Sequence, residues 1–174
     1  MKKLIVILHN IRSTYNVGAI LRTCDCLGID EVVFSGYTPF IDKGLPYERE
    51  KLKKQIHKTA LGAEETLKWH RAEDIFAEIE AQKVKGSKIV ALEQGESSLN
   101  LADGQDFTGD MALVLGEEVH GVPNEILEKC DYLLEIPMCG TKESFNVSVA
   151  TGIALFALRK NELSGSRKFL RTQI

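Results

Sequence analysis

The stretch IPMCGTKESFNVSVATGIALFAL, residues 136–158, is the most informative part of this chain. We expect a strand to end at Ile136, a loop of small and polar residues to follow, and a long apolar helix to begin near Asn146. Helix N-termini expose unpaired backbone N–H groups, and open α/β sheets bind ligands at the carboxyl ends of their strands. The stretch therefore predicts a ligand-binding loop.

Outside this stretch, apolar runs alternate with amphipathic segments. The pattern predicts strands at 4–8, 31–35, 88–92, 111–115 and 132–136, and helices at 16–27, 48–58, 72–84, 124–130 and 146–161. Asn16 is expected to cap the first helix and Gly28 to end it. Residues 97–110 look irregular. The alternation predicts an α/β fold, a mainly parallel sheet with helices on both faces.

The length of 174 residues predicts one domain, and 44% hydrophobic and 27% charged residues are ordinary for a globular protein. We expect this domain at residues 1–161 and a basic, mobile tail at 162–174. No apolar run reaches the roughly 20 residues that span a membrane. The short run at 4–8 is interpreted as a first strand rather than a signal peptide, so we expect a cytoplasmic protein.

The net charge is −3, so overall charge does not predict a nucleic-acid partner. Local charge does: residues 42–58 carry six basic and three acidic side chains, and residues 159–171 carry five basic and one acidic. The alternative for both is a solvated surface. The four cysteines show no zinc-binding spacing and are interpreted as small buried hydrophobic residues, and we expect no metal.

Three polar segments follow expected strands, and parallel strands would gather them at one edge of the sheet. They are residues 9–23 (HNIRSTYNVGAILRT), 113–123 (LVLGEEVHGVP) and 136–158. Together they resemble the three signature motifs of the SPOUT superfamily, specifically its TrmH branch of RNA ribose 2'-O-methyltransferases. Residues 58–64 (KTALGAE) are also similar to the TrmH-type sequence between the first two motifs. The resemblance covers residues 4–158.

This resemblance implies a carboxyl-terminal trefoil knot, a rare exception to unknotted topology, that holds S-adenosylmethionine. It also implies a homodimer, with the last helix and its stripe Val147, Ala150, Ile153, Ala154 and Ala157 at the interface. The adenine would be bound mainly by backbone groups of Ile136 and Met138. The implied cofactor-binding residues are Leu92, Glu93, Gln94, Leu115, Gly116, Glu117, Ile136, Met138, Ser144, Phe145 and Asn146.

The implied reaction is attack of a ribose 2'-hydroxyl on the methyl group, which needs alignment and loss of a proton. By the resemblance, Arg22 is the essential first-motif arginine. It acts either as the base or, because free guanidinium stays protonated, as a positive group that binds phosphate and stabilises the alkoxide. The alternative for Arg22 is a surface ion pair with Asp25.

The remaining implied catalytic residues are Asn16, Glu117, Ser144 and Asn146. Glu117 is expected to hold Asn16 or Arg12 in place, and the alternative is a plain surface carboxylate. For Asn16, Ser144 and Asn146, the alternative is a role in helix capping alone. A histidine is a common general base, but the resemblance gives His120 no fixed role.

RNA is the expected partner, tRNA more than rRNA, because so bare a catalytic domain resembles tRNA-modifying members. The expected RNA-binding residues are Arg12, Arg22, Arg49, Lys51, Lys53 and Lys54. One alternative is a non-catalytic, knotted RNA-binding dimer that acts as a chaperone or scaffold. Another is a nucleotide-binding domain of flavodoxin or Rossmann type, but no G-x-G-x-x-G follows the first strand.

Overall fold

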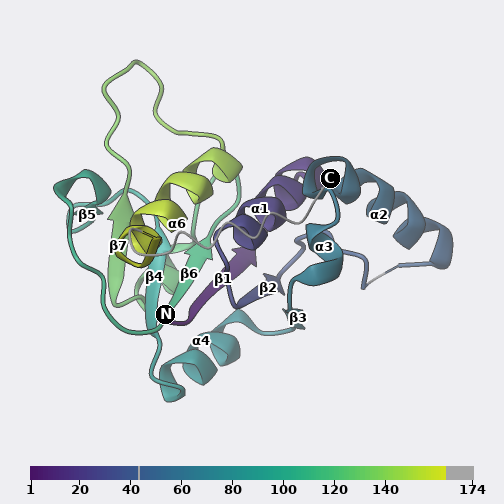
Figure 1. Cartoon of the computed structure of the whole chain (residues 1–174), viewed down its shortest axis with the longest axis horizontal. Helices are drawn as coiled ribbons and strands as arrows, with labels where there is room; N and C mark the ends of the chain where they lie inside the picture. The colour runs from purple at the N-terminus through teal and green to yellow at the C-terminus, as the bar shows by residue number, and fades with distance from the viewer. Residues whose placement is uncertain (43, 164–174) are drawn as a thin grey trace.

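A parallel sheet of seven strands forms the centre of the computed structural model, which describes residues 1–42 and 44–163 (Figure 1). The strand order across the sheet is β3-β2-β1-β6-β4-β7-β5, and all the pairs are parallel. The strands are β1 (Leu4–His9), β2 (Glu31–Ser35), β3 (Trp69–Ala72), β4 (Lys88–Leu92), β5 (Leu99–Asn100), β6 (Met111–Leu115) and β7 (Tyr132–Glu135).

Helices cover both faces of this sheet, as the sequence predicts. One face packs against α1 (Thr14–Cys26), α2 (Pro46–Ala60), α3 (Ala63–Thr66) and α6 (Val147–Leu163), and the other against α4 (Ile75–Val84) and α5 (Asn124–Leu127). Residues of β1 alternate between the two apolar clusters, so every one of its side chains is buried. Strands covered on both sides read as continuous apolar runs, which explains why they were predictable. The trefoil knot stays a prediction.

Several element boundaries differ from the expectations. The first helix starts at Thr14 and is capped by Ser13, whose side chain accepts from the backbone N–H of Asn16, so the expected capping role of Asn16 is wrong. The expected helix at 72–84 begins only at Ile75, after its N-cap Asp74. Two short strands, β3 and β5, the helix α3 and a 3₁₀ turn at Leu101–Asp103 were not predicted.

The helix α1 packs closely on α2 at Gly18. A Cβ atom at this glycine would lie 2.2 Å from Oγ1 of Thr59 and 2.4 Å from the carbonyl oxygen of Ile56. The hydroxyl of Thr59 donates to the carbonyl of Tyr15 over 2.9 Å. Residue 18 must therefore be small if the 58–64 segment is to hold the start of α1.

The last helix is apolar on two sides. Thr151, Ala154, Leu155 and Leu158 are buried against the sheet, while Val149, Ile153 and Phe156 are exposed. The stripe expected at the dimer interface is thus wrong in part, because fully buried Ala154 faces the intrachain core.

The end of α6 is fixed to the start of β1 by Arg159, whose side chain is 1% exposed. Its guanidinium donates to the carbonyl oxygens of Lys2 (2.6 Å) and Gly28 (2.8 Å), and it pairs with Asp30 and Glu162. Arg159 therefore does not belong to a basic surface patch at 159–171, as the charge count had suggested. The helix includes Leu163, so residues 162 and 163 are not tail, and the expected tail from 164 lies outside the described residues.

No helix within the described part of the chain is long and apolar enough to cross a membrane.

Candidate functional site

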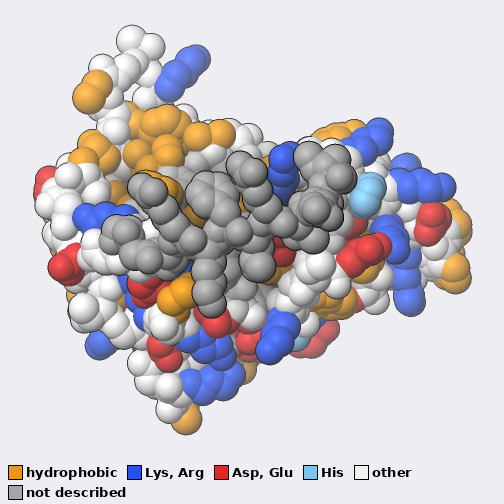
Figure 2. All heavy atoms as spheres, viewed as in Figure 1, with side chains coloured by type: hydrophobic (Ala, Val, Ile, Leu, Met, Phe, Trp, Pro, Cys, Tyr) orange, Lys and Arg blue, Asp and Glu red, His pale blue; other side chains and the backbone are white. Residues whose placement is uncertain are grey.

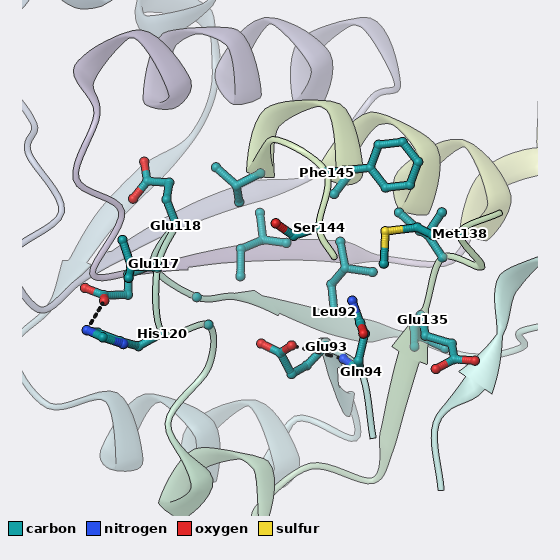
Figure 3. Close-up of a pocket in the computed structure, with 18 residues that line it drawn as sticks. Leu92, Glu93, Gln94, Glu117, Glu118, His120, Glu135, Met138, Ser144 and Phe145 are labelled. Atoms are coloured by element: carbon teal, nitrogen blue, oxygen red, sulfur yellow. Dashed lines mark hydrogen bonds and ion pairs between the residues drawn. The ribbon is translucent and has the colours of Figure 1, made fainter. Parts of the chain in front are cut away.

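A cavity of about 270 Å³ lies where β4, β6 and β7 end (Figure 3). Of the eleven residues expected to bind the cofactor, all except Asn146 line it. Glu117 and His120 lie at one end, Met138 and Phe145 at the other, and Ser144 between them. The lining residues that were not expected to bind the cofactor are Glu118, Val119, His120, Gly121, Leu134, Glu135, Val147 and Ala150.

Two glycines form the tight turn after β6. The backbones of Glu117 and Gly121 exchange two hydrogen bonds of 3.1 and 3.0 Å. A Cβ atom at Gly116 would lie 2.2 Å from the carbonyl carbon of Gly121, and one at Gly121 would lie 2.0 Å from Oε2 of Glu93. That oxygen accepts from the backbone N–H of Val122 over 3.0 Å. Both glycines are needed for the carboxylate of Glu93 to join the end of β4 to this turn.

The loop before α6 is held on two sides. Asn146 caps the helix, because its Oδ1 accepts from the backbone N–H (2.9 Å) and the hydroxyl (2.7 Å) of Ser148. Its Nδ2 donates to Oδ1 of Asn16 over 3.1 Å, which joins the third motif to the first. On the other side, the side-chain amide of Gln94 donates to the carbonyl of Glu143 over 2.8 Å.

Glu118 connects the second motif to the first. Its carboxylate accepts from the side chain of Asn16 (2.8 Å) and from the backbone N–H groups of Arg12 (3.0 Å) and Ser13 (3.2 Å). The expectation that Glu117 makes these contacts is wrong by one residue. Partial burial on its own would raise the pKa of Glu118, but these hydrogen bonds outweigh burial and hold the pKa below its usual value.

Glu117 has different partners. One oxygen accepts from the hydroxyl of Tyr37, and the other lies 3.6 Å from Nε2 of His120. The side chain is 13% exposed, so Glu117 is not a plain surface carboxylate. The hydrogen bond from Tyr37 lowers the pKa of Glu117, which is therefore ionised at neutral pH.

Arg22 is exposed on α1 and does not line the cavity. Asp25 instead accepts from the hydroxyl of Thr66 over 3.0 Å, and no ion pair between Arg22 and Asp25 forms in the described structure. The alternative interpretation of Arg22 as half of a surface ion pair is therefore wrong.

The expected RNA-binding side chains on α2 are all exposed, and Lys and Arg atoms gather over this helix, interspersed with acidic ones, at the right of Figure 2. Lys53 pairs with Glu65 (3.1 Å) and Lys54 with Glu50 (3.5 Å). The charges of Lys53 and Lys54 are therefore partly neutralised, whereas Arg49 and Lys51 form no ion pair with another described residue.

The cysteines do not share one environment. Cys24 is buried, but Cys26 and Cys139 are exposed, so the interpretation of all four as buried hydrophobic residues is wrong for these two. Burial raises the pKa of Cys130 to about 11. In the described residues, no group of three or more His, Cys, Asp or Glu is placed to hold a metal ion.

Comparisons with known proteins agree with this geometry. The sequence model of the SpoU rRNA Methylase family matches residues 3–156. A 23S rRNA (guanosine-2'-O-)-methyltransferase, RlmB, of Haemophilus ducreyi is 33% identical over 92% of this chain, which spans only 61% of that relative. A tRNA (guanosine(18)-2'-O)-methyltransferase of Aquifex aeolicus is 33% identical over 94% of the chain and 72% of the relative. The AdoMet-bound rRNA methyltransferase of Sinorhizobium meliloti superposes with a TM-score of 0.79 at 25% identity, over 91% of this chain and 56% of that one.

Proposed function

Because the chain belongs to the SpoU rRNA methylase family, we propose that it transfers a methyl group from S-adenosylmethionine to a ribose 2'-hydroxyl of a structured RNA. One observation carries the proposal. Residues of all three expected motifs meet beside one cavity at the carboxyl edge of the sheet, where Asn16, Glu118 and Asn146 form a continuous hydrogen-bonded network.

The cavity suits the proposed cofactor. Leu92, Leu115 and Met138 offer apolar surface for an adenine, and the carboxylates of Glu93, Glu117, Glu118 and Glu135 make the lining acidic. Bound S-adenosylmethionine supplies an electrophilic methyl group on a positively charged sulfur, and an acidic lining attracts such a cation. The backbone of Ile136 and Met138, which also line the cavity, is our proposed contact to the adenine.

The side chains around the cavity have separable proposed roles. The network of Asn16, Glu118 and Asn146 keeps the loop before α6 in place, so that Ser144 faces the cavity. Guanidinium groups are cations in proteins, which favours for Arg22 a role in binding an RNA phosphate and stabilising the developing alkoxide over a role as the base. Arg12, Arg49 and Lys51 extend the basic surface that RNA would contact.

We propose tRNA as the substrate. The tRNA (guanosine(18)-2'-O)-methyltransferase of Aquifex aeolicus is 33% identical over 94% of this chain, and the motifs resemble those of the same TrmH branch. The proposal also includes the carboxyl-terminal trefoil knot of the family fold.

A homodimer is the proposed working form. Exposed Ile153 and Phe156 of α6 line an apolar groove together with Leu101 and Pro137, and Val149 is exposed on the same helix. Figure 2 shows hydrophobic side chains gathered over the region of α6, above and to the left of the centre of the view. A contiguous apolar surface of this kind usually marks a protein interface.

The first experiment is transfer of labelled methyl from S-adenosylmethionine to bulk unmodified tRNA and, separately, rRNA, with the modified nucleoside identified by mass spectrometry. A 2'-O-methylated nucleoside from tRNA is the expected result. Product from rRNA alone would overturn the substrate class, and cofactor binding without transfer to either RNA would count against the activity. Absence of both binding and transfer would favour an RNA-binding scaffold.

A further inference from the structure

Tyr37 lies in the turn after β2, outside the three motif segments and outside the lining of the cavity. Its hydroxyl nevertheless donates to Oε2 of Glu117, at the end of the cavity where Figure 3 shows Glu117 and His120. The other carboxylate oxygen of Glu117 is buried and has no hydrogen-bond partner among the described residues, although Nε2 of His120 lies 3.6 Å from it. The hydroxyl of Tyr37 is thus a principal restraint on the direction of this carboxylate.

A chain of hydrogen bonds fixes the backbone of Tyr37. Its N–H donates to Oδ1 of Asn10 over 3.1 Å, and Nδ2 of Asn10 lies 3.1 Å from Nε2 of His9. Since the amide of Asn10 is a donor there, Nε2 accepts and the protonated Nδ1 of His9 donates to the hydroxyl of Ser35 over 3.1 Å. Burial lowers the pKa of His9, which agrees with this neutral form.

The conformation of the turn is specific to this contact. Asn10 adopts φ of 60°, a left-handed conformation that non-glycine residues seldom take. Gly36 also has φ of 60°, and a Cβ atom there would lie 1.9 Å from Oδ1 of Asn10. The side chain of Asn10 thus occupies space that only a glycine at position 36 leaves open.

The turn is held from β3 as well. Arg71, whose side chain is 8% exposed and pairs with Asp42, donates to the carbonyl oxygens of Gly36 (3.3 Å) and Thr38 (3.0 Å). The hydroxyl of Thr38 donates to the carbonyl of Leu8 over 2.8 Å. The side chain of Tyr37 is 56% exposed. Its two neighbours in the chain, Gly36 and Thr38, are nevertheless held in place by these hydrogen bonds.

We propose that Tyr37 is a positioning residue that holds the carboxylate of Glu117 at the end of the cavity for methyl transfer. The inference rests on the proposed function. It assigns a role to a tyrosine that lies outside the three motifs. The turn after β2 brings the hydroxyl of Tyr37 to Glu117 of the second motif, while its backbone N–H contacts Asn10. Pre-organisation of an active-site group by such a supporting shell is what keeps it in its productive direction.

The test is Tyr37→Phe, with Tyr132→Phe as the matched control. Tyr132 is 41% exposed at the amino end of β7, opposite the edge that holds the cavity. We expect Tyr37→Phe to lower kcat about 10-fold, as expected for one hydrogen bond to a charged group, with KM for S-adenosylmethionine within about twofold. Loss of the bond also raises the pKa of Glu117, which Arg12 and His120 face too, so the acid limb of the kcat profile should move to higher pH. Tyr132→Phe should change neither quantity.

A double-mutant cycle shows whether Tyr37 acts through Glu117. In a Glu117→Ala background, which leaves the hydroxyl of Tyr37 no acceptor at this position, Tyr37→Phe should cost less than about twofold in kcat. An unchanged kcat in Tyr37→Phe alone, or the same loss in both backgrounds, would overturn the inference. If the wild type transfers no methyl, the proposed function fails instead. The contact is then tested by NMR titration of ¹³C-labelled glutamate, where an unshifted Glu117 in Tyr37→Phe contradicts it.

Discussion

The side-chain amide of Asn146 donates to Oδ1 of Asn16 over 3.1 Å, across 130 positions of sequence. The same Asn146 caps α6 through its own Oδ1, and Asn16 in turn donates to Glu118. The carbonyl oxygen of the Asn146 side chain thus caps the helix, while the amide nitrogen of the same side chain connects the third motif to the first. The two roles can be separated by mutation.

Asn146→Asp should keep stability and lose activity. Aspartate retains the acceptor for Ser148 but has no amide to donate to Asn16, so we expect unfolding free energy close to wild type and methyl transfer lower by about 10- to 100-fold. Asn146→Ala should in addition lose about 1 kcal/mol of stability with the cap. Denaturant unfolding and methyl transfer measure the two effects, and wild-type activity in Asn146→Asp would show that the contact to Asn16 is dispensable.

Arg22→Ala should abolish methyl transfer, by more than about 100-fold, and leave S-adenosylmethionine binding within about twofold. Cofactor binding should be preserved because Arg22 is exposed on α1 and does not line the cavity. Transfer should be lost because the variant removes the positive charge proposed to stabilise the alkoxide. Arg22→Lys serves as the matched variant, because it keeps the charge without the planar donor fork, and partial activity is expected. Calorimetry measures binding, and turnover of Arg22→Ala close to wild type would remove this residue from the mechanism.

Glu118 should make stability depend on pH. Its pKa is lower in the folded chain than the ordinary value of about 4.3, so its contribution is fully present above that value and is lost as pH falls through the folded pKa. Glu118→Gln should be less stable than wild type by about 1 kcal/mol at pH 7, and the difference should shrink in acid. A difference that stays constant from pH 7 to pH 3 would contradict the assignment.

Phe156→Asp should convert the proposed dimer into a monomer. Phe156 is 59% exposed on α6, and a buried, unpaired carboxylate at an interface is strongly unfavourable. Phe76→Asp on α4 is the control, because Phe76 is 41% exposed on the opposite side of the sheet. Light scattering at micromolar concentration distinguishes the two forms, and a monomeric wild type would rule out the dimer.

Burial on both faces of the sheet made its centre predictable. The apolar runs of β2, β4 and β6 were predicted with the bounds that the structure has. By contrast, β3 lies at the sheet edge and reads WHRA, in which only Ala72 is buried, and β5 has two residues. Short or edge strands of this kind leave no clear periodic pattern in a sequence.

The site was predictable at the level of segments but less so at the level of side chains. The family resemblance implied eleven cofactor-binding residues, and ten of them line one cavity. It did not distinguish Glu117 from Glu118, because the direction of each side chain depends on the turn closed by Gly121. Tyr37 gave no signal at all, since its contact depends on how the turn after β2 sits against Asn10.

The pairing of β1 sets an order of events during synthesis on the ribosome. This central strand is made first, yet Leu4 pairs with Met111 of β6. At typical translation rates, the edge of β1 that pairs with β6 stays unpaired for roughly 5 to 20 s, until β6 has been synthesised. Throughout that interval an apolar strand has an open edge, so the nascent chain should depend on chaperones more than the finished protein does.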